Sequence, residues 1–373
     1  MRNYNLRPMS GLALRRQIGR LLVAGFNGQG IPVELRSLAR EFGLGGIILF
    51  ARNIAEPAQV AELSFDGARL VPDLPCWVSV DQEGGRVARL KAPFTEWPAM
   101  ATLGRSGDAG LAERFAGALG VELRAVGITL DFAPVLDVHT NPKNPIIGDR
   151  ALAEKAADVA ALGSAIIRAL QESGVAACGK HFPGHGDTST DSHIELPLVE
   201  HPPERLREVE FVPFKAAIDA KVASIMTAHV FAPALDETMP ATLSRRVVHD
   251  LLREELGFEG VIFSDDLEMK AIANQHTVPS AAVLSLAAGC DGILICSGNH
   301  DSQAAALEAV VHAVEDGSLP YGRVEDALKR HQRMKERFLA SAVAARPLTA
   351  RALRLAIGTD EHQAIAHQMA RFA

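Results

Sequence analysis

Eight short, continuous apolar runs, separated by amphipathic stretches, constrain the fold of this chain more than any other feature. Runs without polar alternation are typical of strands that are covered on both faces in a parallel sheet. Eight strands, each followed by a helix, match the count of a (β/α)8 barrel, so the sequence predicts an α/β fold with a single TIM-type barrel. The predicted strands are Leu21–Phe26, Gly46–Phe50, Cys76–Val80, Ile128–Ala133, Val175–Gly179, Ser224–Ala228, Gly260–Ser264 and Gly292–Cys296.

The stretches between these runs predict helices. In Ala153–Glu172 apolar residues recur at steps of three and four, and Ser244 is a suitable N-cap for the stretch that follows it. An open doubly wound sheet would need a G-x-G-x-x-G turn after the first strand, which is missing. We expect residues 1–344 to form one catalytic domain and residues 345–373 a C-terminal helical tail.

Composition excludes several classes of protein. The chain has 38 Lys and Arg against 45 Asp and Glu, a net charge of −7, which argues against a nucleic-acid backbone as partner but allows a small anionic ligand held by a few local arginines. No apolar stretch reaches the ~18 residues of a membrane span, and the N-terminus lacks a signal-peptide core. The four cysteines form no CxxC pair, so we expect buried reduced thiols and a cytoplasmic protein.

Polar clusters follow five of the predicted strands. Carboxyl ends of barrel strands carry the chemistry in such folds, so these clusters predict one polar catalytic mouth that suits a polyhydroxylated ligand. Taken singly, Asp81 could be a helix cap and Asp149–Arg150 a surface ion pair. The glycines at 84, 85, 184 and 186 are interpreted as turn residues with positive φ. The clusters are Asp81–Arg89, Gly148–Arg150, Lys180–His193, Ala228–His229 and Ser264–Leu267.

The histidine-rich loop allows two interpretations. His181, His185 and His193 with Asp187 could bind zinc, but Pro183 and Gly184 break the helix that would align the first two, so we expect no metal. Alternatively, Asp191 and His193 are two apart and point the same way in an extended segment. The aspartate could then fix the imidazole tautomer for acid/base work.

A carboxylate facing this pair completes the minimum set for retaining glycoside hydrolysis. Asp265 directly follows a predicted strand and should be held rigidly, whereas Asp266 could cap the next helix.

At this point the sequence resembles a known family. KHFPGHGDTSTDSH, VDQEGGRV, GGIILFARN, FAPVLDV, GDRAL and FSDDLEM are similar to motifs of the β-N-acetylglucosaminidases of glycoside hydrolase family 3, of the NagZ type. The resemblance implies one barrel without cofactor and a covalent glycosyl-enzyme on Asp265. It implies acid/base catalysis by His193, paired with Asp191. It places sugar-binding roles on Asp81, Arg89, Arg150, Lys180 and His181.

The resemblance also implies a substrate. It would be a peptidoglycan fragment, N-acetylglucosamine β-linked to anhydro-N-acetylmuramic acid, during cell-wall recycling. Within the family the alternatives are a glycoside phosphorylase, for which a histidine would tolerate anionic phosphate, and a β-glucosidase, which usually carries a second domain. From other classes, the alternatives are a zinc-dependent hydrolase and a non-catalytic sugar-binding barrel.

Overall fold

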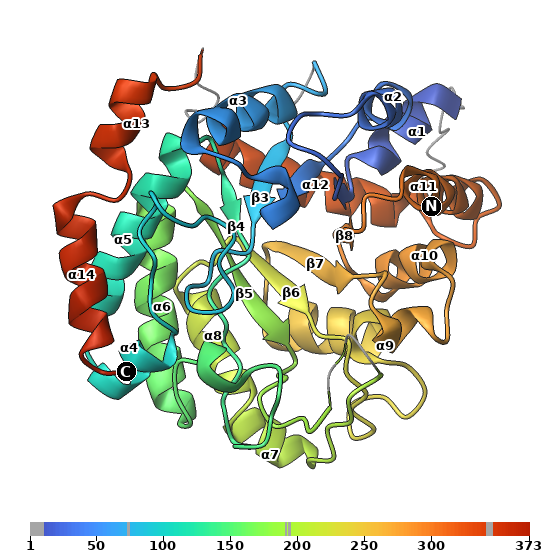
Figure 1. Ribbon diagram of the computed structural model, residues 1–373. Helices are drawn as coiled ribbons and strands as arrows, with labels where there is room; N and C mark the ends of the chain where they lie inside the picture. The colour runs from blue at the N-terminus through green and yellow to red at the C-terminus, as the bar shows by residue number, and fades with distance from the viewer. Residues whose placement is uncertain (1–10, 73–74, 191, 193–194, 341–345) are drawn as a thin grey trace.

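Eight parallel strands close into one barrel in chain order, with helices around it (Figure 1). This computed structural model describes residues 11–72, 75–190, 192, 195–340 and 346–373. Each strand pairs in parallel with the next, and β1 closes the barrel against β8 through pairs such as Val23 with Leu294. The predicted TIM-type α/β fold is confirmed.

The strands differ from prediction mainly at their carboxyl ends. They are β1 Leu22–Ala24, β2 Gly46–Leu49, β3 Trp77–Val80, β4 Leu130–Asp131, β5 Ala176–Phe182, β6 Ser224–Thr227, β7 Val261–Asp266 and β8 Gly292–Ile295. The sequence predicted that β5 and β7 end before their polar residues, but both continue through them. Lys180 and His181 therefore lie in β5, and Asp265 lies in β7, where neighbouring strands hold the backbone.

The helices surround the barrel. They are α1 Gly11–Gly19, α2 Val33–Phe42, α3 Pro57–Ala68, α4 Ala101–Ser106, α5 Ala109–Ala125, α6 Ala156–Glu172, α7 Pro203–Glu208, α8 Phe211–Asp219, α9 Lys270–Ala273, α10 Val278–Ala288, α11 His300–Glu315 and α12 Tyr321–Leu339, with a π-helix, η4, at Arg246–Glu255. The stretch predicted as one helix over Pro203–Ala220 is divided into α7 and α8. Ser244 precedes the helical turn that begins at Arg245 and leads into η4, and its Oγ accepts the Val247 amide at 3.2 Å, the contact of the predicted N-cap.

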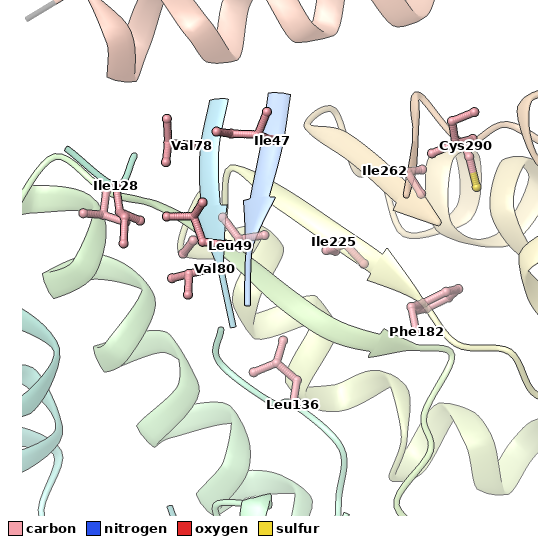
Figure 2. Packing of buried hydrophobic residues seen from close by; sticks show 14 of the residues in the cluster. Ile47, Leu49, Val78, Val80, Ile128, Leu136, Phe182, Ile225, Ile262 and Cys290 are labelled. Carbon is pink, nitrogen blue, oxygen red and sulfur yellow. The ribbon is translucent and has the colours of Figure 1, made fainter. Parts of the chain in front are cut away.

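Two apolar layers stabilise the barrel. Residues that point outward from the strands, such as Ile47, Val78 and Ile225, pack under the helices (Figure 2). Inside the barrel a second cluster includes Trp77 and Phe263, and α12 closes its amino-terminal end with Met334, Phe338 and Leu339. The polar mouth is thus left at the opposite end.

The tail forms two helices, α13 Ala350–Ala356 and α14 Asp360–Ala370, which lie along the α5 side of the barrel (Figure 1). Their main polar anchor is buried Glu122 of α5. Its carboxylate accepts the Gly358 amide at 2.9 Å and contacts His362 Nδ1 at 2.8 Å. Buried Met369 adds apolar contact, so the predicted helical appendage packs on the barrel.

Two further expectations concern the chain as a whole. The four cysteines are buried and free, as predicted. Within the described ranges, no helix has the length and apolar character needed to span a bilayer.

Candidate active site

A pocket of about 190 Å³ opens at the carboxyl ends of the strands. All five predicted sugar-binding residues line it, and so does Asp265. They come from the segment after β3, the η2 turn (Gly148–Arg150), β5 and β7, and the closed barrel brings these segments together. The pocket is lined by Asp81, Glu83, Arg89, Arg150, Lys180, His181, His185, Ser192, Asp265 and Asp266, with apolar side chains that include Phe50, Met226 and Met269.

An ion network forms one wall of the pocket. Lys180 Nζ lies 2.8 Å from Asp81 Oδ1 and 2.7 Å from Glu83 Oε1. Arg150 binds both oxygens of Glu83, through Nε and an Nη, each at 2.8 Å. The alternative of an Asp149–Arg150 surface pair is wrong, because Asp149 binds Arg86 at 2.9 Å instead. The network positions two cations and two carboxylates that could bind sugar hydroxyls.

The network favours the charged forms of Glu83, Lys180 and Arg150 although little solvent reaches them. Burial alone would raise the pKa of Glu83, but the charges of Arg150 and Lys180 outweigh it and lower that pKa. Burial would conversely lower the pKa of Lys180, and Asp81 and Glu83 raise it. The pKa of Arg150 is raised against burial by Glu83. Fixed charges of this kind need little reorganisation when a ligand binds.

Gln82 shapes the segment that carries Arg89. Its side-chain Oε1 accepts the backbone amides of Arg89 at 2.7 Å and Leu90 at 3.0 Å, and its backbone amide donates to Asp131 Oδ1 at 2.9 Å. Arg89 then reaches Asp81 at 3.5 Å. Burial raises the pKa of Asp131 well above its ordinary value, and its carboxyl accepts the backbone amide of Gln82.

Asp137 orients the two histidines at the end of β5. Its Oδ2 lies 2.7 Å from His181 Nδ1, and its Oδ1 accepts the His185 amide at 2.7 Å. Burial would raise the pKa of Asp137, but the charge of His181 and its hydrogen bond lower that pKa. His181 Nδ1 is thereby engaged, which leaves Nε2 for a ligand in the pocket.

Asp265 and Asp266 have different environments. Burial would raise the pKa of Asp265, but the positive charges of His229 and His181 and the Asp266 amide at 2.8 Å lower it. Burial raises the pKa of Asp266 to about 7. The Asp266 side chain accepts the amides of Glu268 and Cys296, each at 3.2 Å. Of these two neighbours, Asp265 is therefore the one that favours the ionised form.

Ser192 is held at two points beside the pocket. Its Oγ lies 3.3 Å from His185 Nε2, and its carbonyl accepts the Ala271 amide at 3.1 Å, at the start of α9. The Thr188 hydroxyl donates to the His185 carbonyl at 3.0 Å, so His185 Nδ1 must be the donor in its 2.6 Å contact with Thr188 Oγ1. His185 Nε2 therefore accepts from Ser192. The predicted Asp191 and His193 lie outside the described residues.

Glycine is required in this region for two different reasons, backbone conformation and close packing. Gly84, Gly85 and Gly184 have positive φ, as predicted. The prediction for Gly186 is wrong, since its φ is not in that region. A Cβ there would lie 1.9 Å from the Val138 carbonyl oxygen, so close packing requires this glycine.

The alternative of a metal site finds no support in the described part of the chain. These residues include no group of three or more His, Cys, Asp or Glu side chains that could bind an ion. His181 and His185 lie edge to face with ring centroids 6.0 Å apart, and Asp137 and Thr188 occupy their Nδ1 atoms.

Sequence reasoning gave no role to Glu83, Asp137 or His229. Glu83 bridges Lys180 and Arg150, Asp137 orients two histidines, and His229 lies behind Asp265 with Nε2 2.9 Å from the Asp266 carbonyl. The sequence signal that could have identified these residues was their position close to the ends of apolar runs. Asp137 and His229 directly follow apolar residues, and Glu83 lies three residues after the apolar run that ends at Val80, so all three are near the mouth.

Comparison with known proteins points to one family. Residues 13–334 match the glycosyl hydrolase family 3 N-terminal domain. A β-hexosaminidase of Pseudomonas aeruginosa is 41% identical over 288 residues, 76% of this chain and 84% of the relative. One of Nitrosomonas eutropha is 38% identical over 301 residues, 79% of this chain and 86% of the relative.

Solved structures extend the comparison to the tail. A family 3 β-N-acetylglucosaminidase from Paenibacillus is 43% identical with a TM-score of 0.91, over 96% of this chain and 68% of that one. NagZ from Neisseria gonorrhoeae, in complex with N-trifluoroacetyl-D-glucosamine, is 32% identical with a TM-score of 0.75, over 95% of this chain and 98% of that one. With its barrel, its polar pocket and these relatives together, the chain belongs to glycoside hydrolase family 3.

Proposed function

We propose that this protein is a retaining β-N-acetylhexosaminidase that removes terminal, non-reducing β-linked N-acetylglucosamine. One observation carries the proposal most directly. Asp265, an ionised carboxylate at the end of β7, shares a small pocket with the Asp81–Glu83–Lys180–Arg150 network. A rigid nucleophile beside charged groups suited to hydroxyls fits a single sugar ring better than an extended apolar ligand.

In the first step an oxygen of Asp265 attacks the anomeric carbon. The glycosidic C–O bond breaks, His193 gives a proton to the leaving oxygen, and a glycosyl-aspartate ester forms. In the second step His193 takes a proton from water, the water oxygen attacks the anomeric carbon, and the Asp265 carboxylate is released. Asp191 holds the imidazole in the required tautomer. Two displacements retain the anomeric configuration.

Asp81, Arg89, Arg150, Lys180 and His181 hold the sugar in this proposal. The contacts of Lys180 and Arg150 with Glu83 support these roles, because they fix both cations at the pocket wall. No metal is required, since carboxylate and imidazole fill every role. Turnover should survive a chelator, and loss of activity that zinc restores would contradict this part.

The natural substrate we propose is N-acetylglucosamine linked to anhydro-N-acetylmuramic acid in peptidoglycan fragments, which implies a cytoplasmic enzyme of cell-wall recycling. Support comes from the likeness to NagZ, whose solved complex contains an N-acylated glucosamine. In the same proposal residues 1–344 are the catalytic domain and residues 345–373 are a helical tail.

The decisive test compares turnover of an aryl β-N-acetylglucosaminide with that of the aryl β-glucoside. We expect a strong preference for the first. Equal rates would remove the N-acetyl assignment and favour a β-glucosidase. Repeating the assay in phosphate buffer separates hydrolysis from phosphorolysis, because free sugar forms in the first reaction and glycosyl phosphate in the second.

A further inference from the structure

A second pocket, of about 470 Å³, lies at the amino-terminal end of the barrel strands, opposite the candidate active site. Its walls are the turn before β6, the turn before β7 and one face of α12. Four cationic side chains line it, Lys221, Arg330, Arg333 and Arg337, against a single acid, Glu259. We propose that this pocket binds a small phosphate-bearing anion.

The charge of the pocket is opposite to that of the protein. Its lining has four positive groups and one negative group, a surplus of three positive charges, in a chain whose net charge is −7. Buried Asp291 does not cancel this surplus. It binds Arg330 at 3.4 Å, but it also binds Arg253 at 2.7 Å and Arg323. An anion entering the pocket therefore meets uncompensated charge.

Three of the four cations are regularly spaced along one helix. Arg330, Arg333 and Arg337 recur at steps of three and four along α12, so they share one face of the helix. Like charges at such spacing destabilise a helix unless a counter-ion lies between them. A bound anion would relieve this repulsion.

Of the three arginines, two have printed contacts that fix their positions and one is available. Arg337 donates to the Lys221 carbonyl at 3.2 Å and lies over the Phe338 ring at 4.7 Å. Arg330 is tied to Asp291. Among the described residues Arg333 has no ion-pair partner and is exposed at the pocket. Guanidinium groups bind phosphate oxygens in pairs of parallel hydrogen bonds, which favours phosphate over a diffuse halide.

The neighbouring turn is also held in place. Arg253 donates to the carbonyls of Phe258 and Gly260, the latter at 2.9 Å, so the wall that carries Glu259 is fixed by the same buried group that neutralises Asp291. A pocket with fixed walls loses little entropy on binding. Its volume would accommodate a phosphorylated sugar or a nucleotide.

Calorimetric titration of the full chain with pyrophosphate tests the proposal. It should be run at low ionic strength, with potassium chloride at matched ionic strength as the blank. Saturating N-acetylglucosamine should be present, because Lys180 and Arg150 could also attract the probe. We expect saturable binding in the wild type and binding about tenfold or more weaker in Arg333→Ala, since one charge-assisted contact is lost.

Two matched variants make the result specific. Arg40→Ala removes an exposed arginine of α2 that does not line the pocket, and this variant should bind like the wild type. Glu259→Gln removes the one acid and should bind more tightly. Absence of saturable binding, equal weakening by Arg40→Ala, or no change in Arg333→Ala would overturn the proposal. The Arg333 comparison does not depend on the proposed glycosidase activity, so failure of one leaves the other standing.

Discussion

Asp265 and Asp266 are neighbours at the end of β7, yet the pKa of the first is lowered while burial raises the pKa of the second to about 7. The difference follows from their partners. Asp265 lies near His229 and His181, whereas Asp266 lies near Glu268 and accepts the backbone amides of Glu268 and Cys296. Near neutral pH one is ionised and the other is partly protonated, which suits a nucleophile beside a structural carboxyl.

This difference predicts a pH-dependent effect of Asp266→Asn on stability. A carboxyl whose folded pKa lies above its unfolded value contributes stability below the unfolded pKa and loses it as pH rises through the folded pKa. For Asp266 that window runs from about 4, the ordinary aspartate value, to about 7. The asparagine keeps an acceptor oxygen for the two amides. The free energy of unfolding of the variant relative to wild type should therefore increase between pH 4 and pH 8.

Chemical denaturation at several pH values measures this difference. A constant difference across the range would show that Asp266 titrates normally. Asp250→Asn is the matched control, because this aspartate is exposed on η4.

Asp265 should carry the covalent intermediate. Asp265→Asn keeps the shape of the side chain and the contact with the Asp266 amide but removes the nucleophile, so turnover should be abolished. A slow fluorinated glycosyl donor should label Asp265 in the wild type, as located by peptide mass spectrometry. Labelling of Asp266 instead, or inversion of configuration in the product, would refute the assignment.

Sequence reasoning predicted the barrel because eight buried strands must be apolar along their whole length, as Gly46–Leu49 and Gly292–Ile295 are. It misplaced the ends of β5 and β7 for the same reason. Lys180 and Asp265 are charged, and they lie in the last residues of β5 and β7. A pattern of apolar residues cannot indicate that a strand continues through charged residues at the pocket.

The pocket residues could be predicted as a set, since strand order in a barrel brings successive carboxyl ends together. Their pairing could not. That Arg150 binds Glu83 and not its neighbour Asp149 depends on the depth at which each side chain lies, since Glu83 is buried and Asp149 is exposed. Such distances are set by packing and leave no periodic signal.

Glu83→Gln should weaken the enzyme in both stability and binding. Lys180 and Arg150 would lose the carboxylate that neutralises them in a buried site, and breaking a buried ion pair costs about 3–5 kcal/mol. The pKa of Glu83 is lowered by folding, so its contribution is present above the unfolded pKa and is lost as pH falls. The difference in unfolding free energy from wild type should shrink below about pH 4.

Kinetics of Glu83→Gln should show a raised KM for the aryl N-acetylglucosaminide. The control is Glu56→Gln, an exposed glutamate before α3. Unchanged stability and KM in Glu83→Gln would show that Asp81 alone is sufficient to hold Lys180.

His193→Ala should affect substrates according to their leaving groups. Poor leaving groups need protonation and should slow most, whereas activated aryl groups should still form the glycosyl-enzyme and then stall at hydrolysis. Asp191→Ala should reduce turnover by about 10²–10⁴, the range expected for impaired acid–base catalysis. Burst kinetics with a series of aryl glycosides measure both steps. An equal loss for every leaving group would make His193 a binding residue.

Ser192→Ala tests whether the hydrogen bond between Ser192 and His185 contributes to positioning the neighbouring catalytic pair, Asp191 and His193. The variant removes the hydroxyl that donates to His185 Nε2 but keeps the carbonyl that accepts the Ala271 amide. Burial lowers the pKa of His185 to about 4, so its Nε2 remains an acceptor throughout the neutral range.

If the Ser192 hydroxyl positions the acid/base, kcat should fall about tenfold for substrates with poor leaving groups, because a catalytic group loses its alignment. The change in kcat should be smaller for activated leaving groups, and KM should change little. Ser192→Thr, which retains a hydroxyl, is the matched control and should recover most of the loss. A uniform fall in thermal stability with the leaving-group dependence unchanged would instead assign Ser192 a purely structural role.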